Sequence, residues 1–227
     1  KNLLAAEDAA QKAIALAPQD YRGYLGLGKI YYHQGRYRLA FEVLQTVLKL
    51  NPGNAESVIV VRGRTSGGGS HTLGGKAQEA EVGFSNDEAY VVLGNMYKDQ
   101  EKFVEAKDMY EKALAVKPLQ IGALIGLGWV MYHEKDYRKA QDHFEKAAQV
   151  YPQISLVWKE LGWFYKCRKD YTHASAAFEK AISLNIRNYR VFLELAWIYK
   201  QEKKYAEAEH VLRQAIKMNP RDDRAIG

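Results

Sequence analysis

Three tryptophans recur at one fixed interval in the second half of the sequence, as Trp129, Trp163 and Trp197. Cations stand near them in the chain, at Lys159, Lys166 and Lys200. An indole ring presents a large apolar face, and exposed aromatic residues with charged neighbours are typical of binding hot spots. These residue types therefore predict recognition, in which a ligand is held and no bond is made or broken.

Residues for bond-making chemistry are present, but they lack the spacing that it requires. A glycine-rich stretch between Gly69 and Gly75 fails as a phosphate-binding loop, because five residues separate these glycines and Ala77 stands where Ser or Thr would bind Mg²⁺. No pair of histidines has metal-ligand spacing together with a carboxylate or cysteine. The six histidines are His33, His71, His133, His143, His173 and His210. We therefore expect no catalytic residue, no cofactor and no metal, and a protein that is not an enzyme.

The tryptophans lie inside a repeated sequence. The stretch "LGWVMYHEKDY" begins at residue 127, and similar stretches begin at residues 27, 93, 161 and 195. The starts at 93, 127, 161 and 195 are 34 residues apart, and a fixed period of this size is typical of a repeat architecture. In the copy at 121–154, apolar residues follow helical spacing twice, once on each side of a turn. Each copy is therefore predicted to be a pair of antiparallel helices.

Small residues occupy one register in every copy. Glycine inside a helix costs about 1 kcal/mol relative to alanine, so a repeated one needs a structural reason. We expect the two helices of each pair to touch at these positions. They are Gly28, Gly94, Gly128, Gly162 and Ala196 on the first helices, and Ala40, Ala106, Ala140, Ala174 and Ala208 on the second.

This pattern resembles the tetratricopeptide repeat. The unit that matches best carries Trp158, Leu161, Gly162, Tyr165, Ala174, Phe178 and Ala181. The resemblance implies an all-α solenoid of stacked helical hairpins, wound as a right-handed superhelix, with first helices lining a concave groove. On this basis residues 1–20 are a half repeat, and full repeats span 21–54, 87–120, 121–154, 155–188 and 189–222.

Residues 55–86 break the pattern and are rich in glycine. Two interpretations stay open. The segment is either a degenerate repeat, since its length is close to one period, or a flexible glycine-rich insertion. The ends cut across repeats, so we expect the sequence to be part of a larger protein, although open ends that stack on other copies are an alternative.

A second face of the first helices lies about 140–150° from the face that packs the hairpin. By resemblance to the family, this face points into the groove, and Gly122 and Gly126 are expected to leave room there beside Trp129. The tryptophans then form either a binding ladder or a packing layer between neighbouring first helices. The predicted groove residues are Trp129, Trp163, Trp197, Lys29, Tyr32, His33, Asn95, Tyr132, His133, Lys159, Glu160, Lys166, Glu194 and Lys200.

The favoured function is a non-catalytic scaffold that binds an extended peptide or partner helix in this groove. A polysaccharide-binding array of the kind associated with export, and a self-assembling unit, are the alternatives. The family's carboxylate clamp is absent, because no Lys–Asn pair stands four apart on a first helix: Leu25 precedes Lys29, and Val91 precedes Asn95.

Composition narrows the partners. The net charge of +6 is spread along the chain without a Lys/Arg block, which disfavours nucleic acid and slightly favours acidic partners. No apolar run approaches the ~18 residues that span a membrane. The single Cys167 excludes an internal disulfide and leaves the compartment open, with the cytoplasm favoured over the periplasm or the exterior.

Overall fold

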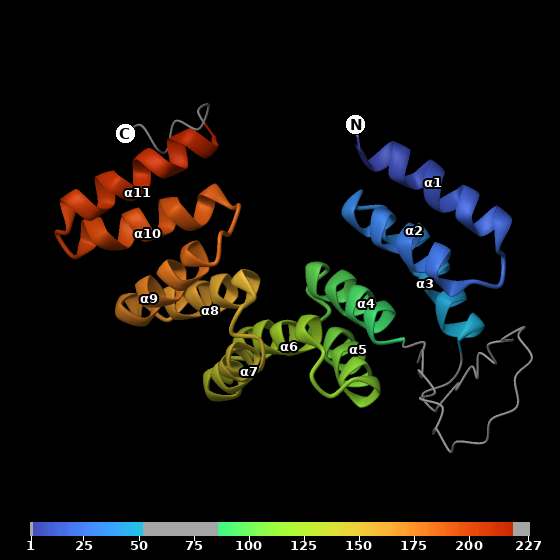
Figure 1. Cartoon of the computed structure of the whole chain (residues 1–227). Helices are drawn as coiled ribbons and strands as arrows, with labels where there is room; N and C mark the ends of the chain where they lie inside the picture. The colour runs from blue at the N-terminus through green and yellow to red at the C-terminus, as the bar shows by residue number, and fades with distance from the viewer. Residues whose placement is uncertain (1, 52–85, 220–227) are drawn as a thin grey trace, which may run out of the picture. The chain divides into compact units, whose positions relative to one another are not determined.

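The computed structural model describes residues 2–51 and 86–219, and all its regular elements there are α-helices (Figure 1). The helices follow one another as antiparallel pairs joined by short turns, so the predicted all-α solenoid of helical hairpins is confirmed. The right-handed sense of the array stays a prediction. The two interpretations of 55–86 and the last residues of the repeat at 189–222 lie outside the described residues. Two compact units, 1–93 and 94–227, are described separately below.

The first unit contains α1 (Asn2–Leu16), α2 (Tyr21–His33), α3 (Tyr37–Leu50) and the start of α4 (Asp87–Asp99). Helix α1 packs on α2, where a Cβ atom at Gly23 would lie 2.9 Å from Ile14. Helices α2 and α3 touch at Gly28, where a Cβ atom would lie 2.8 Å from the fully buried Leu44. The small residues in this hairpin therefore allow the close helix contact that the sequence predicts.

In its described part, the second unit continues from α4 through seven helices. They are α5 (Phe103–Val116), α6 (Ile121–His133), α7 (Tyr137–Val150), α8 (Ser155–Cys167), α9 (Tyr171–Ser183), α10 (Tyr189–Gln201) and α11 (Tyr205–Met218). A Cβ atom at Gly128 would lie 2.8 Å from Phe144, and one at Gly162 would lie 2.6 Å from Phe178. Both phenylalanines are buried, so the prediction that these glycines lie at helix contacts is confirmed.

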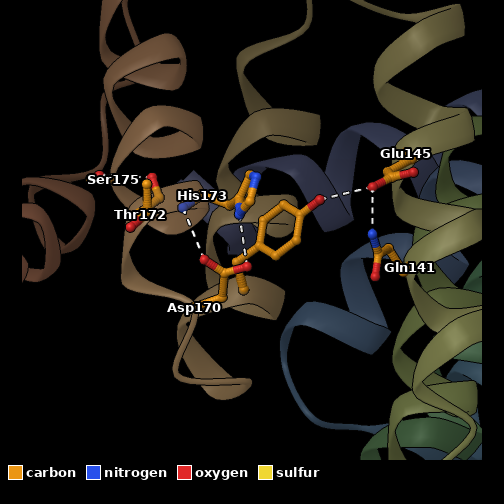
Figure 2. A network of polar contacts seen from close by, with 7 residues as sticks. Gln141, Glu145, Asp170, Thr172, His173 and Ser175 are labelled. Carbon is orange, nitrogen blue, oxygen red and sulfur yellow. Dashed lines mark hydrogen bonds and ion pairs between the residues drawn. The ribbon is translucent and has the colours of Figure 1, made fainter.

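Neighbouring hairpins of the second unit are joined by a recurring hydrogen bond. The Tyr165 hydroxyl on α8 donates to Glu145 on α7 at 2.8 Å, and the Tyr199 hydroxyl on α10 donates to Glu179 on α9 at 2.7 Å. The same Glu145 oxygen also accepts a 2.8 Å hydrogen bond from the Gln141 side chain (Figure 2). Burial, together with the hydrogen bond to the glutamate, raises the pKa of both tyrosines above the ordinary value.

Each turn between the two helices of a hairpin contains one residue in the left-handed region. It is Gly35 in the first hairpin, with φ of 72°, but Lys169 between α8 and α9, with φ of 61°. The second helix of the hairpin begins two residues after this left-handed residue. Asp170 caps α9 by accepting a hydrogen bond from the backbone nitrogen of His173 at 3.2 Å (Figure 2).

Candidate functional site

The first tryptophan, Trp129 on α6, is half-buried and makes two specific contacts. Its ring packs edge-on against Phe144 of α7, with centroids 5.2 Å apart and an interplanar angle of 75°. Its indole nitrogen donates a 2.9 Å hydrogen bond to Glu160 of α8. Trp129 thus links its own hairpin to the next first helix.

The second tryptophan, Trp163 on α8, repeats the ring contact one period later. It packs edge-on against Phe178 of α9, with centroids 5.7 Å apart and an angle of 80°. It is half-buried against the apolar core shared by α9, α10 and α11. Two cations lie over its ring: Lys166 Nζ at 5.1 Å and Arg190 Cζ at 5.9 Å from the centroid.

The third tryptophan, Trp197 on α10, is 40% exposed. It contacts Tyr171 of α9 edge-on, with centroids 5.3 Å apart. It is more exposed than the half-buried Trp163. Lys166 Nζ also lies 5.4 Å from the Trp197 ring, so one ammonium group lies near two successive tryptophans, where it forms an ion pair with Glu194.

Two hollows open beside these rings. A pocket of about 280 Å³, called here the indole pocket, is lined by Trp129, Lys159, Trp163, Asn188 and Arg190. A second hollow of about 480 Å³ adjoins Trp197. Its lining combines apolar and charged residues: Lys166, Leu193, Glu194, Ala196, Trp197, Lys200, Tyr205, Ala208, Glu209 and Leu212. The first helices α6, α8 and α10 therefore combine aromatic walls with cations, the combination that suits a partner segment with apolar and acidic groups.

A family profile described as the cilia and flagella-associated protein 70 C-terminal domain matches residues 65–226, which is more than half of the chain. The chain belongs to this tetratricopeptide-repeat family. A general tetratricopeptide-repeat profile matches residues 2–55. No curated protein matches the chain significantly.

Solved structures with this fold include several other repeat proteins. A chain of the APC/C hetero-tetramer Cut9-Hcn1 is 17% identical, with a TM-score of 0.73 over 99% of this chain. The match spans only 38% of that chain. The pilF protein of Pseudomonas aeruginosa is 22% identical, with a TM-score of 0.67 over 100% of this chain and 82% of its own. YrrB, described as having an unusual peptide-binding site, is 19% identical, with a TM-score of 0.53 and 97% of each chain covered. At these identities the likeness shows the fold alone.

Eight of the predicted groove residues lie near one another on three first helices of this tetratricopeptide-repeat array. They are Trp129, Lys159, Glu160, Trp163, Lys166, Glu194, Trp197 and Lys200. Two more predicted residues, Tyr132 and His133, are engaged by neighbouring rings. Tyr132 packs edge-on against Trp129 at 5.7 Å, and His133 stacks on Phe103 of α5 at 4.5 Å.

The remaining predicted residues have other partners. Asn95 accepts a 2.7 Å hydrogen bond from the Tyr110 hydroxyl, which directs its side chain toward α5. Lys29 forms an ion pair with Glu88 inside the first unit. Tyr32 contacts the Tyr37 ring at 6.1 Å, and the exposed His33 lies next to Tyr32. Whether any of these residues binds a ligand stays a prediction.

The expected room beside Trp129 is partly filled. A Cβ atom at Gly126 would lie 2.3 Å from the ring of Tyr110, which is fully buried. Gly126 therefore makes space for a core tyrosine of α5, and the prediction that it opens the groove is wrong.

Two lining residues of the indole pocket, Asn188 and Arg190, are not among the predicted groove residues. A signal for one of them existed, because Arg190 stands two periods after Gly122, which lies on the predicted groove face. The ladder of tryptophans is defined by one position, the residue after each small Gly or Ala. Arg190 lies in the first turn of α10, before that position, so the tryptophan pattern does not include it.

Within the described ranges, no helix is long and apolar enough to cross a membrane. In the same part of the chain, no three His, Cys, Asp or Glu side chains are grouped so that they could hold a metal ion.

Proposed function

We propose that the face formed by α6, α8 and α10 binds an extended segment of another protein, and that the chain acts as a scaffold without catalytic chemistry of its own. The tetratricopeptide-repeat fold generally mediates protein–protein interaction. The observation that carries the finer proposal is the indole pocket, in which two tryptophans one period apart and two cations line the same hollow.

Half-burial of the tryptophans is compatible with this role. The edge-on contacts with Phe144 and Phe178 hold the two rings in fixed orientations, so little conformational entropy is lost when a ligand packs on the remaining surface. Rigid aromatic anchors next to charged groups are the residues that dominate binding energies in protein interfaces.

The peptide-binding site described for YrrB, a repeat protein of the same fold, supports a peptide as the type of ligand. The family is named for a cilia and flagella-associated protein. Ciliary and flagellar proteins are therefore the first class in which to look for a segment that resembles a peptide bound by this face.

The test begins with a random dodecapeptide library displayed on phage and selected on the whole chain. The affinity of an enriched peptide, labelled with a fluorophore, is then measured by anisotropy for wild type, Trp163→Ala and Trp158→Ala. Trp158 is a matched control, because it lies on the same helix but donates its indole hydrogen bond to Pro152 at 2.8 Å, outside the indole pocket. Trp163→Ala should weaken binding about 30-fold or more, the loss typical of a hot spot.

Trp158→Ala should leave the affinity within about threefold. Equal losses in the two variants would show that the effect is general destabilisation. If no peptide is enriched, the proposal is wrong, and binding on a glycan array would then favour the polysaccharide alternative. Sedimentation that increases with protein concentration would favour self-assembly.

A further inference from the structure

We infer that the indole pocket recognises an acidic side chain of the bound segment, and that Arg190 is the residue that selects it. This inference rests on the proposed function, since it names the chemistry of the ligand at the same face.

The pocket lining is basic. Lys159 and Arg190 contribute cations, Asn188 contributes a neutral amide, and no carboxylate lines the pocket. Glu160 follows Lys159 on α8, and both of its oxygens are occupied: one pairs with Lys159 at 2.8 Å, and the other accepts the Trp129 indole hydrogen bond at 2.9 Å. Lys159 is thus largely neutralised, which leaves Arg190 as the main uncompensated charge.

Arg190 has no ion pair within the described part of the chain. Its side chain is exposed, and its guanidinium carbon lies 5.9 Å from the Trp163 ring centroid. Its backbone nitrogen donates to the Asn188 side chain at 3.1 Å, which caps α10. The guanidinium thus stands at the edge of an aromatic wall with its donors available, where a carboxylate can accept two parallel hydrogen bonds.

The same position in the first full repeat shows why Arg190 is available. Arg22 occupies that position in α2, and the capping residue there is Asp20. Asp20 accepts from the Arg22 backbone nitrogen at 2.9 Å and also from its guanidinium, at 2.6 Å for the closest nitrogen. The aspartate thus caps the helix and neutralises its arginine.

At α10 the capping residue is Asn188, which retains the backbone hydrogen bond but carries no charge. The change from Asp to Asn between equivalent positions therefore separates capping from charge neutralisation. Its consequence is an arginine whose charge is directed to a ligand, beside two tryptophans that can hold the apolar part of the same segment.

This comparison supplies a decisive variant. Asn188→Asp keeps the cap and Arg190 but should create the internal pair that Asp20 forms with Arg22. Arg190→Gln removes the cation directly. Both variants should bind a peptide that contains the acidic residue about tenfold more weakly, which is the effect expected for losing a hydrogen bond between charged groups. Asp20→Asn, the reciprocal change outside the pocket, is the matched control and should leave the affinity unchanged.

The probes are dodecapeptides enriched from the random library on wild type, each paired with a copy in which every Glu is replaced by Gln and every Asp by Asn. We expect the enriched set to be rich in acidic residues, and we expect the amide copies to bind wild type about tenfold more weakly. For Arg190→Gln and Asn188→Asp, the acidic and amide copies should bind almost equally.

Two results would separate the inference from the proposed function. If enriched peptides lack acidic residues but still lose affinity with Trp163→Ala, the face binds peptides and the acidic preference is wrong. If wild type discriminates acid from amide but Arg190→Gln and Asn188→Asp do so equally well, another cation selects the ligand and the role of Arg190 is wrong.

Discussion

The indole nitrogen of Trp129 donates a 2.9 Å hydrogen bond to the Glu160 carboxylate on the neighbouring first helix. The ring of the same tryptophan packs on Phe144 and still lines the indole pocket. A binding ladder and a packing layer, which the sequence presents as alternatives, are therefore compatible within one side chain. Because the contacts that stabilise the fold are identified, the contributions of Trp129 to folding stability and to ligand binding can be measured separately.

Trp129→Phe should lower the free energy of unfolding by about 1 kcal/mol beyond the loss of ring area, because it removes the donor to Glu160. A double-mutant cycle with Glu160→Ala, followed by urea denaturation, isolates this hydrogen bond. A coupling energy near zero would mean that water replaces the indole donor at no cost.

Gly126→Ala should be destabilising by about 1–3 kcal/mol, because the new methyl group would overlap the buried Tyr110 ring. Gly26 occupies the same repeat position in α2, where a Cβ atom would meet nothing within 4 Å. Gly26→Ala should therefore be neutral or stabilising by up to about 1 kcal/mol. The pair of variants differs only in environment, and equal thermal midpoints would contradict the assigned register of α5 against α6.

Lys169→Gly should stabilise the chain by roughly 0.5–1 kcal/mol, because a lysine with φ of 61° pays a steric cost that glycine avoids. Gly35 already meets this requirement in the equivalent turn of the first hairpin, so Gly35→Ala should be destabilising there. Lys169→Ala is the control, since it removes the charge and keeps the Cβ atom. A gain of similar size from Lys169→Ala would show that charge, rather than backbone strain, sets the effect.

The helices were predictable because each apolar stripe recurs at the same register. The sequence predicts a pair of helices in the repeat at 21–54, and the structure places α2 at Tyr21–His33 and α3 at Tyr37–Leu50. Helical period and turn residues are local signals, so the same pattern in each copy of the repeat supports the same prediction.

The indole pocket was only partly predictable, because its lining comes from three helices. The period predicts Trp129 and Trp163, but the role of Arg190 depends on whether the residue that caps its helix carries a charge. Gly126 shows the same limit from the other side. Its place on the predicted groove face suggests open space beside Trp129, yet the Tyr110 ring from the preceding hairpin fills the space next to Gly126.

Alkaline pH should weaken the contacts between hairpins through Tyr165 and Tyr199. Burial and the hydrogen bonds to Glu145 and Glu179 raise the pKa of these phenols in the folded state above the value of about 10 in an unfolded chain. A raised folded pKa means that their contribution to stability is fully present below about pH 10 and is lost as the pH rises further. The thermal midpoint of wild type should therefore fall more between pH 8 and about pH 10.5 than that of Tyr165→Phe/Tyr199→Phe, in which these groups no longer titrate.

At pH 8 the double variant should itself be less stable, by roughly 1–3 kcal/mol in total, because two hydrogen bonds between hairpins are gone. The exposed Tyr205 provides the control, and Tyr205→Phe should follow wild type at both pH values. Parallel pH profiles for wild type and the double variant would show that the two phenols are not held in their neutral form by the fold.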